Sequence, residues 1–172
     1  MVLNKIPTTL AGLENLMVKQ FRTLQDLVMV TKKEREILPL NDTDALMCVV
    51  EEKEALLDQL GLLDDARRKT LHDIELEFGI QNENSSLEDI FPYLDESQAT
   101  RLSRLRDGVS TLVAQARDLN YGNQALATSM VDWLHAAQKF MIDLAQPETS
   151  YRPPSHIPAF NTGKSWGVDH RA

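Results

Sequence analysis

The sequence is poor in cysteine and in long hydrophobic runs, and each shortage excludes a class of protein. The single cysteine, Cys48, has no partner for an internal disulfide, which excludes a disulfide-stapled secreted scaffold. No apolar run approaches the roughly 18 residues that a membrane-spanning helix requires. Residues 1–7 also lack the apolar stretch of a signal peptide. We therefore expect a cytoplasmic protein that does not insert into a membrane.

Positive charge is also in short supply. The chain has 18 lysine and arginine residues against 26 aspartate and glutamate residues, which gives a formal net charge of −8. An acidic surface repels the phosphate groups of nucleic acids and of anionic lipids, so we expect neither as a partner. We interpret the charge runs KKERE (32–36) and EEKE (51–54) as solvated faces of helices.

Motifs for catalysis or for cofactor binding are missing as well. The sequence contains no glycine-rich phosphate loop, no G-x-S-x-G nucleophile motif and no cysteine pair. The nearest approach to a metal motif is His72-x-x-Glu75 together with Asp132-x-x-His135. Both histidines fall at outward positions of the helical pattern, which favours surface polar residues over metal ligands. We predict a protein that is not an enzyme and holds no metal or cofactor.

Proline is absent from long tracts of the chain, and its positions show where helices can form. Four of the seven prolines lie in the last 26 residues, and the other three lie at the edges of proline-free tracts. Because proline interrupts a helix, this distribution predicts three long helices and a Pro-rich flexible tail. The predicted helices span about 8–38, 42–78 and 96–145, and the tail spans 147–172.

Apolar residues recur at steps of three and four within each tract, the spacing that forms one face of a helix. In the third helix they form a heptad seam from Leu102 to Leu144. About three residues separate the first two helices, which must therefore form an antiparallel hairpin. We predict an all-α fold, an elongated antiparallel three-helix coiled-coil bundle over residues 1–146. The second helix is expected to bury Leu46, Val49, Val50, Leu56, Leu57, Leu60, Leu63, Leu71, Ile74 and Phe78.

Polar residues ahead of each tract predict where the helices begin. Asn41 or Asp42 can cap the second helix, as serine, threonine, aspartate and asparagine often do. A short extra helix, LEDIF, is expected in the connection before the third helix. Two pairs have the spacing of a capping box, and these are Ser85 with Glu88 and Asp95 with Gln98.

Two asparagines interrupt the apolar seam of the third helix, within LNYGNQAL (119–126). Asn123 falls at an a position and Asn120 at the neighbouring e position, so both are expected to face the core in one polar layer. A buried amide must find hydrogen bonds or lose about 1–3 kcal/mol, so such a layer can fix the register of the helices. The alternative is that this layer, or the groove beside it, receives a segment of a partner.

The tail carries aromatic residues in a polar, proline-rich context. Tyr151, Phe160 and Trp166 are candidate docking anchors, because aromatic side chains bury a large area with few rotatable bonds. The alternative is that Phe160 or Trp166 folds back onto the helices.

The segment EREILPLNDTDALMCVVEEKEALLDQLGLLDDARRKTL (34–71) resembles the central block of the FlgN-type flagellar export chaperones. The shared features are an E-R-E ending of the first helix, an acidic cap, and an E-K-E-A-L-L helix. Asn120 and Asn123 resemble the N-x-x-N element of that family, and Trp166-Gly167 resembles its C-terminal aromatic-glycine element. The resemblance covers about residues 10–145 and this tail element.

The resemblance implies a cytoplasmic, non-enzymatic chaperone for the hook–filament junction proteins FlgK and FlgL. Such chaperones bind the helix-prone C-terminal segment of the client and deliver it to the FlhA component of the export gate. The tail residues Tyr151, Phe160, Trp166 and Gly167 would then dock at the gate, although the chain has tryptophan where the family has tyrosine. The rival interpretation is a generic helical-hairpin adaptor or a secretion-system structural subunit without a chaperone cycle. Self-association is compatible with both.

A client segment needs an apolar surface to bind. The C-terminal half of the third helix offers large apolar side chains and adaptable methionines, which suit an amphipathic partner. The predicted client-binding residues are Leu126, Met130, Trp133, Leu134 and Met141.

Overall fold

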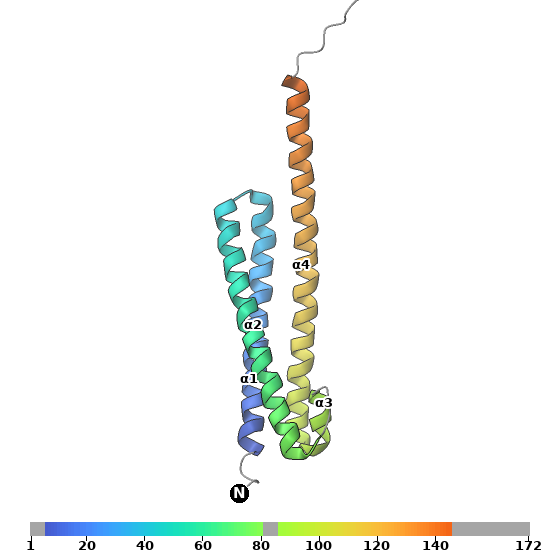
Figure 1. The fold of residues 1–172 in the computed structure, drawn as a ribbon. Coiled ribbons are helices and arrows are strands. Elements are labelled where there is room, and N and C mark those ends of the chain that lie inside the picture. The colour runs from blue at the N-terminus through green and yellow to red at the C-terminus, as the bar shows by residue number, and fades with distance from the viewer. Residues whose placement is uncertain (1–5, 81–85, 146–172) are drawn as a thin grey trace, which may run out of the picture. The chain divides into compact units, whose positions relative to one another are not determined.

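The computed structural model describes residues 6–80 and 86–145, and this part of the chain is almost entirely helical. Its helices are α1 (Ile6–Ile37), α2 (Thr43–Phe78), α3 (Leu87–Ile90) and α4 (Glu96–Ala145) (Figure 1). Two 3₁₀ turns, η1 (Leu38–Leu40) and η2 (Phe91–Tyr93), complete the connections, and no strand occurs among the described residues. The predicted all-α class is confirmed.

The chain divides into two compact units, Met1–Asp132 and Trp133–Ala172. The first unit contains α1, α2, α3 and the greater part of α4, and the second contains the last residues of α4. The predicted boundary at residue 146 stays a prediction, because residues 146–172 lie outside the described part of the chain.

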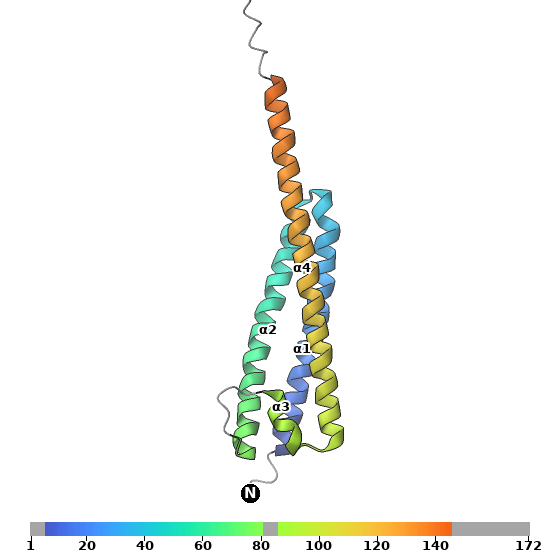
Figure 2. The ribbon, with the colours of Figure 1, turned by 90° about the vertical axis from the view of Figure 1, so that its right-hand side faces the viewer.

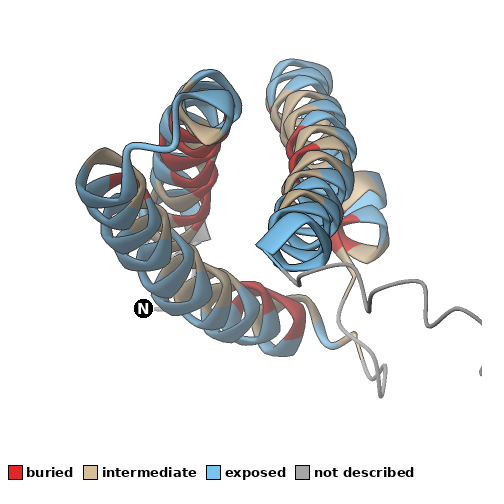
Figure 3. Cartoon of the chain, turned by 90° about the horizontal axis from the view of Figure 1, so that it is seen from above, coloured by how far each residue is buried: buried red, intermediate tan, exposed pale blue. Residues whose placement is uncertain are grey.

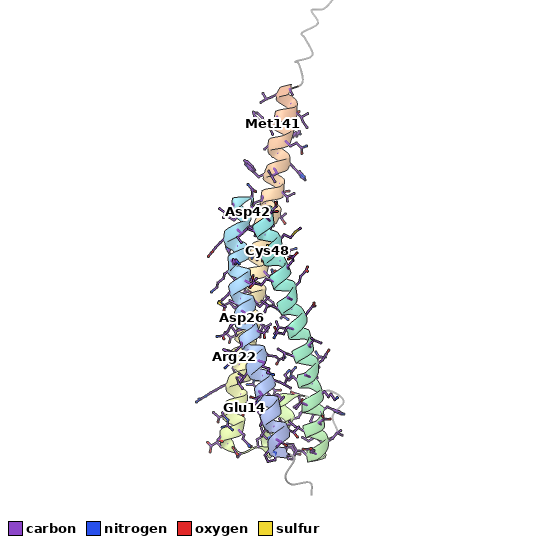
Figure 4. The ribbon with its side chains drawn as sticks, turned by 90° about the vertical axis from the view of Figure 1, so that its left-hand side faces the viewer. Glu14, Arg22, Asp26, Asp42, Cys48 and Met141 are labelled. Carbon is purple, nitrogen blue, oxygen red and sulfur yellow. The ribbon has the colours of Figure 1, made fainter. Side chains whose placement is uncertain are left out.

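α1 and α2 form an antiparallel hairpin around η1 (Figures 1 and 4). Local chemistry sets both ends of α2. Asp42 is the N-cap, and its side chain accepts a hydrogen bond of 3.0 Å from the backbone N–H of Ala45. Gly79 ends the helix in the left-handed conformation, with φ of 71°, which glycine adopts without steric cost. The predicted cap at Asn41 or Asp42 is thus resolved as Asp42, and the end at Gly79 is confirmed.

Two predicted boundaries were wrong by one or two residues. α1 begins at Ile6 instead of near Thr8, because Pro7 fits the first turn of a helix, where no backbone N–H is needed. The capping box of α3 pairs Ser86 with Asp89, one residue after the predicted pair of Ser85 with Glu88.

The register of α3 has a physical reason in its apolar residues. A helix that begins after Ser86 points Leu87 and Ile90, three residues apart, towards the core, where both are buried. The predicted LEDIF helix therefore ends at Ile90, and Phe91 starts the 3₁₀ turn that contains Pro92.

The core of the first unit has two clusters, and α1 contributes to both. Figure 3 shows the buried residues in red. The first cluster joins all four helices and contains Leu10, Leu13, Met17, Leu71, Ile74, Leu87, Ile90 and Leu102. The second contains Leu24, Leu27, Val28 and Ala116. In the first unit α4 therefore runs in the same direction as α1 and antiparallel to α2.

The sequence predicted more buried residues in α2 than the structure shows. Of the ten residues expected to be buried, Val49, Leu71 and Ile74 are buried, whereas Leu57 keeps 50% of its surface exposed and Val50 keeps 37%. Ala116 is the buried residue that α4 contributes to the second cluster, where it packs with residues of α1, and the middle of α2 is left partly uncovered. An apolar stripe shows which face of a helix tends to be buried, but it does not show whether another helix of the chain or a partner buries it.

The start of α4 is a predicted capping box, and it is confirmed. The Asp95 carboxylate accepts a hydrogen bond of 2.8 Å from the backbone N–H of Gln98, and the Gln98 side chain accepts one of 3.3 Å in return. The hydrogen bond from the Gln98 backbone, followed by one from the Ser97 hydroxyl, lowers the pKa of the Asp95 carboxyl below its usual value. Ionised Asp95 is therefore the form that caps the helix.

This cap makes stability depend on pH in a predictable direction. Because the pKa of Asp95 is lower in the folded chain, its contribution is present above the unfolded value, near 3.9, and is lost as the pH falls through the folded value. In Asp95→Asn the amide oxygen still caps the helix but does not titrate. We expect the melting temperature of the wild type to fall more than that of Asp95→Asn between neutral pH and about pH 3. Circular dichroism melts would measure it, and parallel curves would contradict the cap assignment.

Candidate partner-binding surfaces

A groove opens in the first unit between α2 and α4, with α1 as its floor. It encloses a cavity of about 320 Å³. Six of its lining residues are apolar, and these are Leu24, Leu27, Leu57, Leu60, Val113 and Ala116. The other four are Thr31, Lys53, Arg117 and Asn120. We call this feature the α2–α4 groove, and it is mainly an apolar surface with two cations.

The groove exists because only one end of the space between α2 and α4 is filled. At that end α3 lies between the two helices (Figure 2), where Leu87 and Ile90 pack into the first core cluster. α3 is only four residues long, so it leaves the rest of the space open. A groove beside the polar layer was among the sequence-based predictions only as an alternative, and Leu57 and Leu60 were expected in the core instead of in its lining, because helical periodicity gives no distance between helices.

The polar layer lies next to this groove and connects three helices. Asn123 is buried, and its Nδ2 donates hydrogen bonds of 2.8 Å to the Thr31 carbonyl oxygen and of 2.8 Å to the Glu34 carboxylate. Lys53 Nζ donates to the same Glu34 oxygen at 2.7 Å and to Asn120 Oδ1 at 2.7 Å. The two asparagines therefore belong to one network, with Asn123 buried and Asn120 exposed.

Two members of the network were not predicted. Glu34 and Lys53 come from the charge runs that were interpreted as solvated faces, yet their side chains are only 14% and 15% exposed. That interpretation was wrong for these two residues, because α4 approaches the α1–α2 hairpin at this level and covers them. A glutamate and a lysine on facing helices are the available signal, but their pairing depends on a register that neither run specifies.

One atom of the network lacks a partner. Asn123 Oδ1 is buried and has no hydrogen bond to any residue that the structure describes. Exchanging the amide oxygen and nitrogen would not help, because the oxygen would then face two acceptors, the Thr31 carbonyl and the Glu34 carboxylate. Burying this oxygen without a hydrogen bond therefore costs about 1–3 kcal/mol of folding stability.

The predicted client-binding residues have graded exposure along α4. Leu126 and Met130, in the first unit, are half-buried. Trp133 and Met141, in the second unit, keep 67% and 62% of their surfaces exposed, and Leu134 keeps 49%. Figure 4 shows the Met141 side chain on the surface of its helix. Large apolar side chains are thus available on this helix.

The predicted seam is not buried along its whole length. After Asn123 no described residue of α4 is buried, and this stretch includes Phe140 and Leu144, which the heptad pattern placed in the seam. Phe140 and Leu144 are therefore further exposed apolar residues that the sequence analysis assigned to the core. The pattern was correct for the helix but did not distinguish its buried residues from its exposed ones.

Neither a metal site nor a membrane-spanning helix occurs among the described residues. No group of three or more histidine, cysteine, aspartate and glutamate side chains among them is placed to hold a metal ion. Nor is any helix within these residues both long and apolar enough to cross a membrane.

Comparison with known families identifies the chain. The model of the family described as FlgN protein matches residues 1–157. The chain belongs to the FlgN family. Comparisons with the curated proteins and with the solved structures found no match. The resemblance seen in the sequence is confirmed.

Membership in the FlgN family implies a role as a flagellar export chaperone, and the family is one of chaperones and not of enzymes. It favours this role over the generic adaptor or structural subunit. The FlgN match extends beyond α4 to residue 157. Tyr151, Phe160, Trp166 and Gly167 lie outside the described residues, so their predicted role at the gate stays a prediction.

Proposed function

We propose that this FlgN-family chain is a cytoplasmic chaperone for hook–filament junction proteins of the FlgK and FlgL type, which it delivers to an FlhA-like export gate. The observation that carries the proposal is the exposed apolar surface of α4. Trp133 and Met141 keep more than half of their surfaces exposed, and Leu134 keeps 49%. Isolated apolar residues are common on protein surfaces, but a concentration of large ones on one helix indicates a partner.

The chemistry of these residues suits a helix-prone client segment. An amphipathic client helix would place its apolar side chains at helical spacing against the predicted client-binding residues. Methionines such as Met130 and Met141 adapt to different side chains, which would let one surface bind two related clients. Ordering the client on binding costs about 2–5 kcal/mol, which keeps the complex releasable at the gate.

The division of labour between α4 and the tail is the part of the proposal that a truncation tests. A chain that ends after Gln146 loses Tyr151, Phe160 and Trp166 but keeps the predicted client-binding residues. We expect it to bind a peptide of the client C-terminal segment within about tenfold of the full chain, or 1.4 kcal/mol. Isothermal calorimetry with this peptide is the measurement. Complete loss of client binding would show that the tail is part of the client site.

The complementary variant is Trp166→Ala in the full-length chain. It should weaken binding to the cytoplasmic domain of FlhA while client affinity, measured on the same preparation, stays unchanged. Equal affinity of the variant and the wild type for the FlhA domain would contradict the assignment of gate docking to Trp166.

A further inference from the structure

We propose that the α2–α4 groove is a second docking surface, which takes about two turns of an amphipathic helix with an acidic residue at one end. We assign this helix to the export client, and that assignment rests on the proposed function. The surface is distinct from the exposed residues of α4 at Trp133 and Met141, because the groove is lined by α1, α2 and residues 113–120 of α4.

α3 shows what kind of element fits between α2 and α4. It is a short helix whose two apolar residues, Leu87 and Ile90, are 6% and 0% exposed and pack with residues of α2 and α4. The α2–α4 groove continues the same space beyond α3, and its walls carry Leu57 on α2 and Val113 on α4. A second short helix in this space would cover the middle of α2 in the way that α3 covers its C-terminal end.

The dimensions of the groove limit the length of the occupant. Its lining spans residues 24–31 of α1, 53–60 of α2 and 113–120 of α4, which is seven residue steps on each helix. Seven steps at 1.5 Å per residue make about 10 Å, or two helical turns. Apolar side chains at positions i, i+3 or i+4, and i+7 of a bound helix would therefore cover the groove.

Charge gives the occupant a polar requirement. Among the ten described residues that line the groove, two are cations and none is acidic. Lys53 is already paired with Glu34 at 2.7 Å, but Arg117 makes no ion pair with any residue that the structure describes. In a chain of net charge −8 an unpaired arginine beside an apolar cavity favours an acidic side chain of the partner.

Other occupants fit these requirements less well. The chain's own tail has four prolines between residues 147 and 158, and its apolar residues Phe160 and Trp166 are six positions apart, off the helical spacing. A second copy of the chain could supply the exposed apolar residues of its own α4, which the proposed function assigns to the client, and the protein would then self-associate through the groove. Self-association is therefore an outcome that the test must detect.

The experiment places a charge in the groove and compares it with the same charge elsewhere on α2. Leu57 lines the groove and is 50% exposed, whereas Leu62 is 74% exposed and does not line it, so Leu57→Glu and Leu62→Glu form a matched pair. In calorimetric titrations of the full chain with the client C-terminal peptide, we expect Leu57→Glu to weaken binding about tenfold or more. Leu62→Glu should change it by less than about twofold.

A second pair tests the charge. Arg117 lines the groove, and Arg104 is an exposed arginine of α4 outside it. Arg117→Glu should weaken client binding about fivefold and reduce its dependence on salt, because it removes the attraction to an acidic residue. Arg104→Glu should have neither effect. All four positions are partly or fully exposed, so melting temperatures should stay close to that of the wild type.

The outcomes separate this inference from the proposed function. If the wild type does not bind the client peptide, the proposed function fails, and the occupant assigned here fails with it. If the wild type binds and Leu57→Glu binds equally well, only the groove assignment is overturned. If sedimentation shows a wild-type dimer that Leu57→Glu dissociates without a change in client affinity, the occupant is a second copy, which also overturns the proposal.

Discussion

Replacing Trp133 and Met141 together with alanine is expected to weaken binding of the client C-terminal segment by about 100-fold, or roughly 3 kcal/mol. Trp133 keeps 67% of its surface exposed and Met141 keeps 62%, so both have a large apolar area to bury against a partner. Burial of a side chain of this size contributes about 1.5–3 kcal/mol, and interface energy concentrates in a few such residues. Calorimetry with the full-length variant and the client peptide would measure the loss.

A neighbouring residue provides the matched control. Ile142 is 49% exposed and follows Met141, but at 100° per residue it points to the opposite side of the helix from Trp133. Ile142→Ala should change client affinity by less than about threefold. Because none of the three side chains is buried, all variants should melt close to the wild type. Wild-type affinity in the double variant would show that the client does not bind this part of α4.

Replacing Lys53 with methionine is expected to destabilise the fold by about 3 kcal/mol, which for a chain of this length lowers the melting temperature by about 6–12 °C. The substitution removes the cation from Glu34, whose side chain is only 14% exposed, and leaves a nearly buried carboxylate without its charged partner. Chemical denaturation would measure the free energy of unfolding. Lys33 offers the control, since it pairs with Glu52 at 3.8 Å and both side chains are more than half exposed. Lys33→Met should therefore cost less than about 1 kcal/mol.

The same network decides between the two interpretations of the asparagines. Asn123→Leu removes the buried Oδ1 that has no partner and the two hydrogen bonds that Nδ2 donates, while Glu34 keeps its bond to Lys53. If the layer fixes register, this variant should be more stable than the wild type by about 1 kcal/mol and should bind the client normally. Loss of client binding at unchanged stability would instead assign the layer to partner recognition.

The sequence predicted those features of the fold that local chemistry determines. The capping side chains Asp42 and Asp95 and the left-handed Gly79 act within a few residues of the chain, so their patterns can be read directly. The same holds for the length of α4, which the next proline limits. Errors at this level were shifts of one or two residues, as at Ser86.

The partially covered face of α2 and the pair of Glu34 with Lys53 could not be predicted in this way. Both depend on where α4 lies relative to the hairpin, and helical periodicity gives no distance between helices. Leu57 has the same spacing as a core residue but lines a groove, and Lys53 has the same context as a solvated lysine but is nearly buried. An apolar stripe is the same signal whether its cover is supplied by the chain itself or by a partner.

The short η1 connection between α1 and α2 has a consequence for how the chain is made. Closing a hairpin around so few residues costs little loop entropy, and its contacts do not require the later part of the chain. Synthesis proceeds from the N-terminus, so α1 and α2 leave the ribosome and can pair before α4 has been translated. The apolar residues of α4 emerge last among the described helices, when a folded hairpin is already present to order the first half of that helix. The nascent chain therefore spends little time with the apolar residues of α4 exposed while the rest of the chain is unfolded.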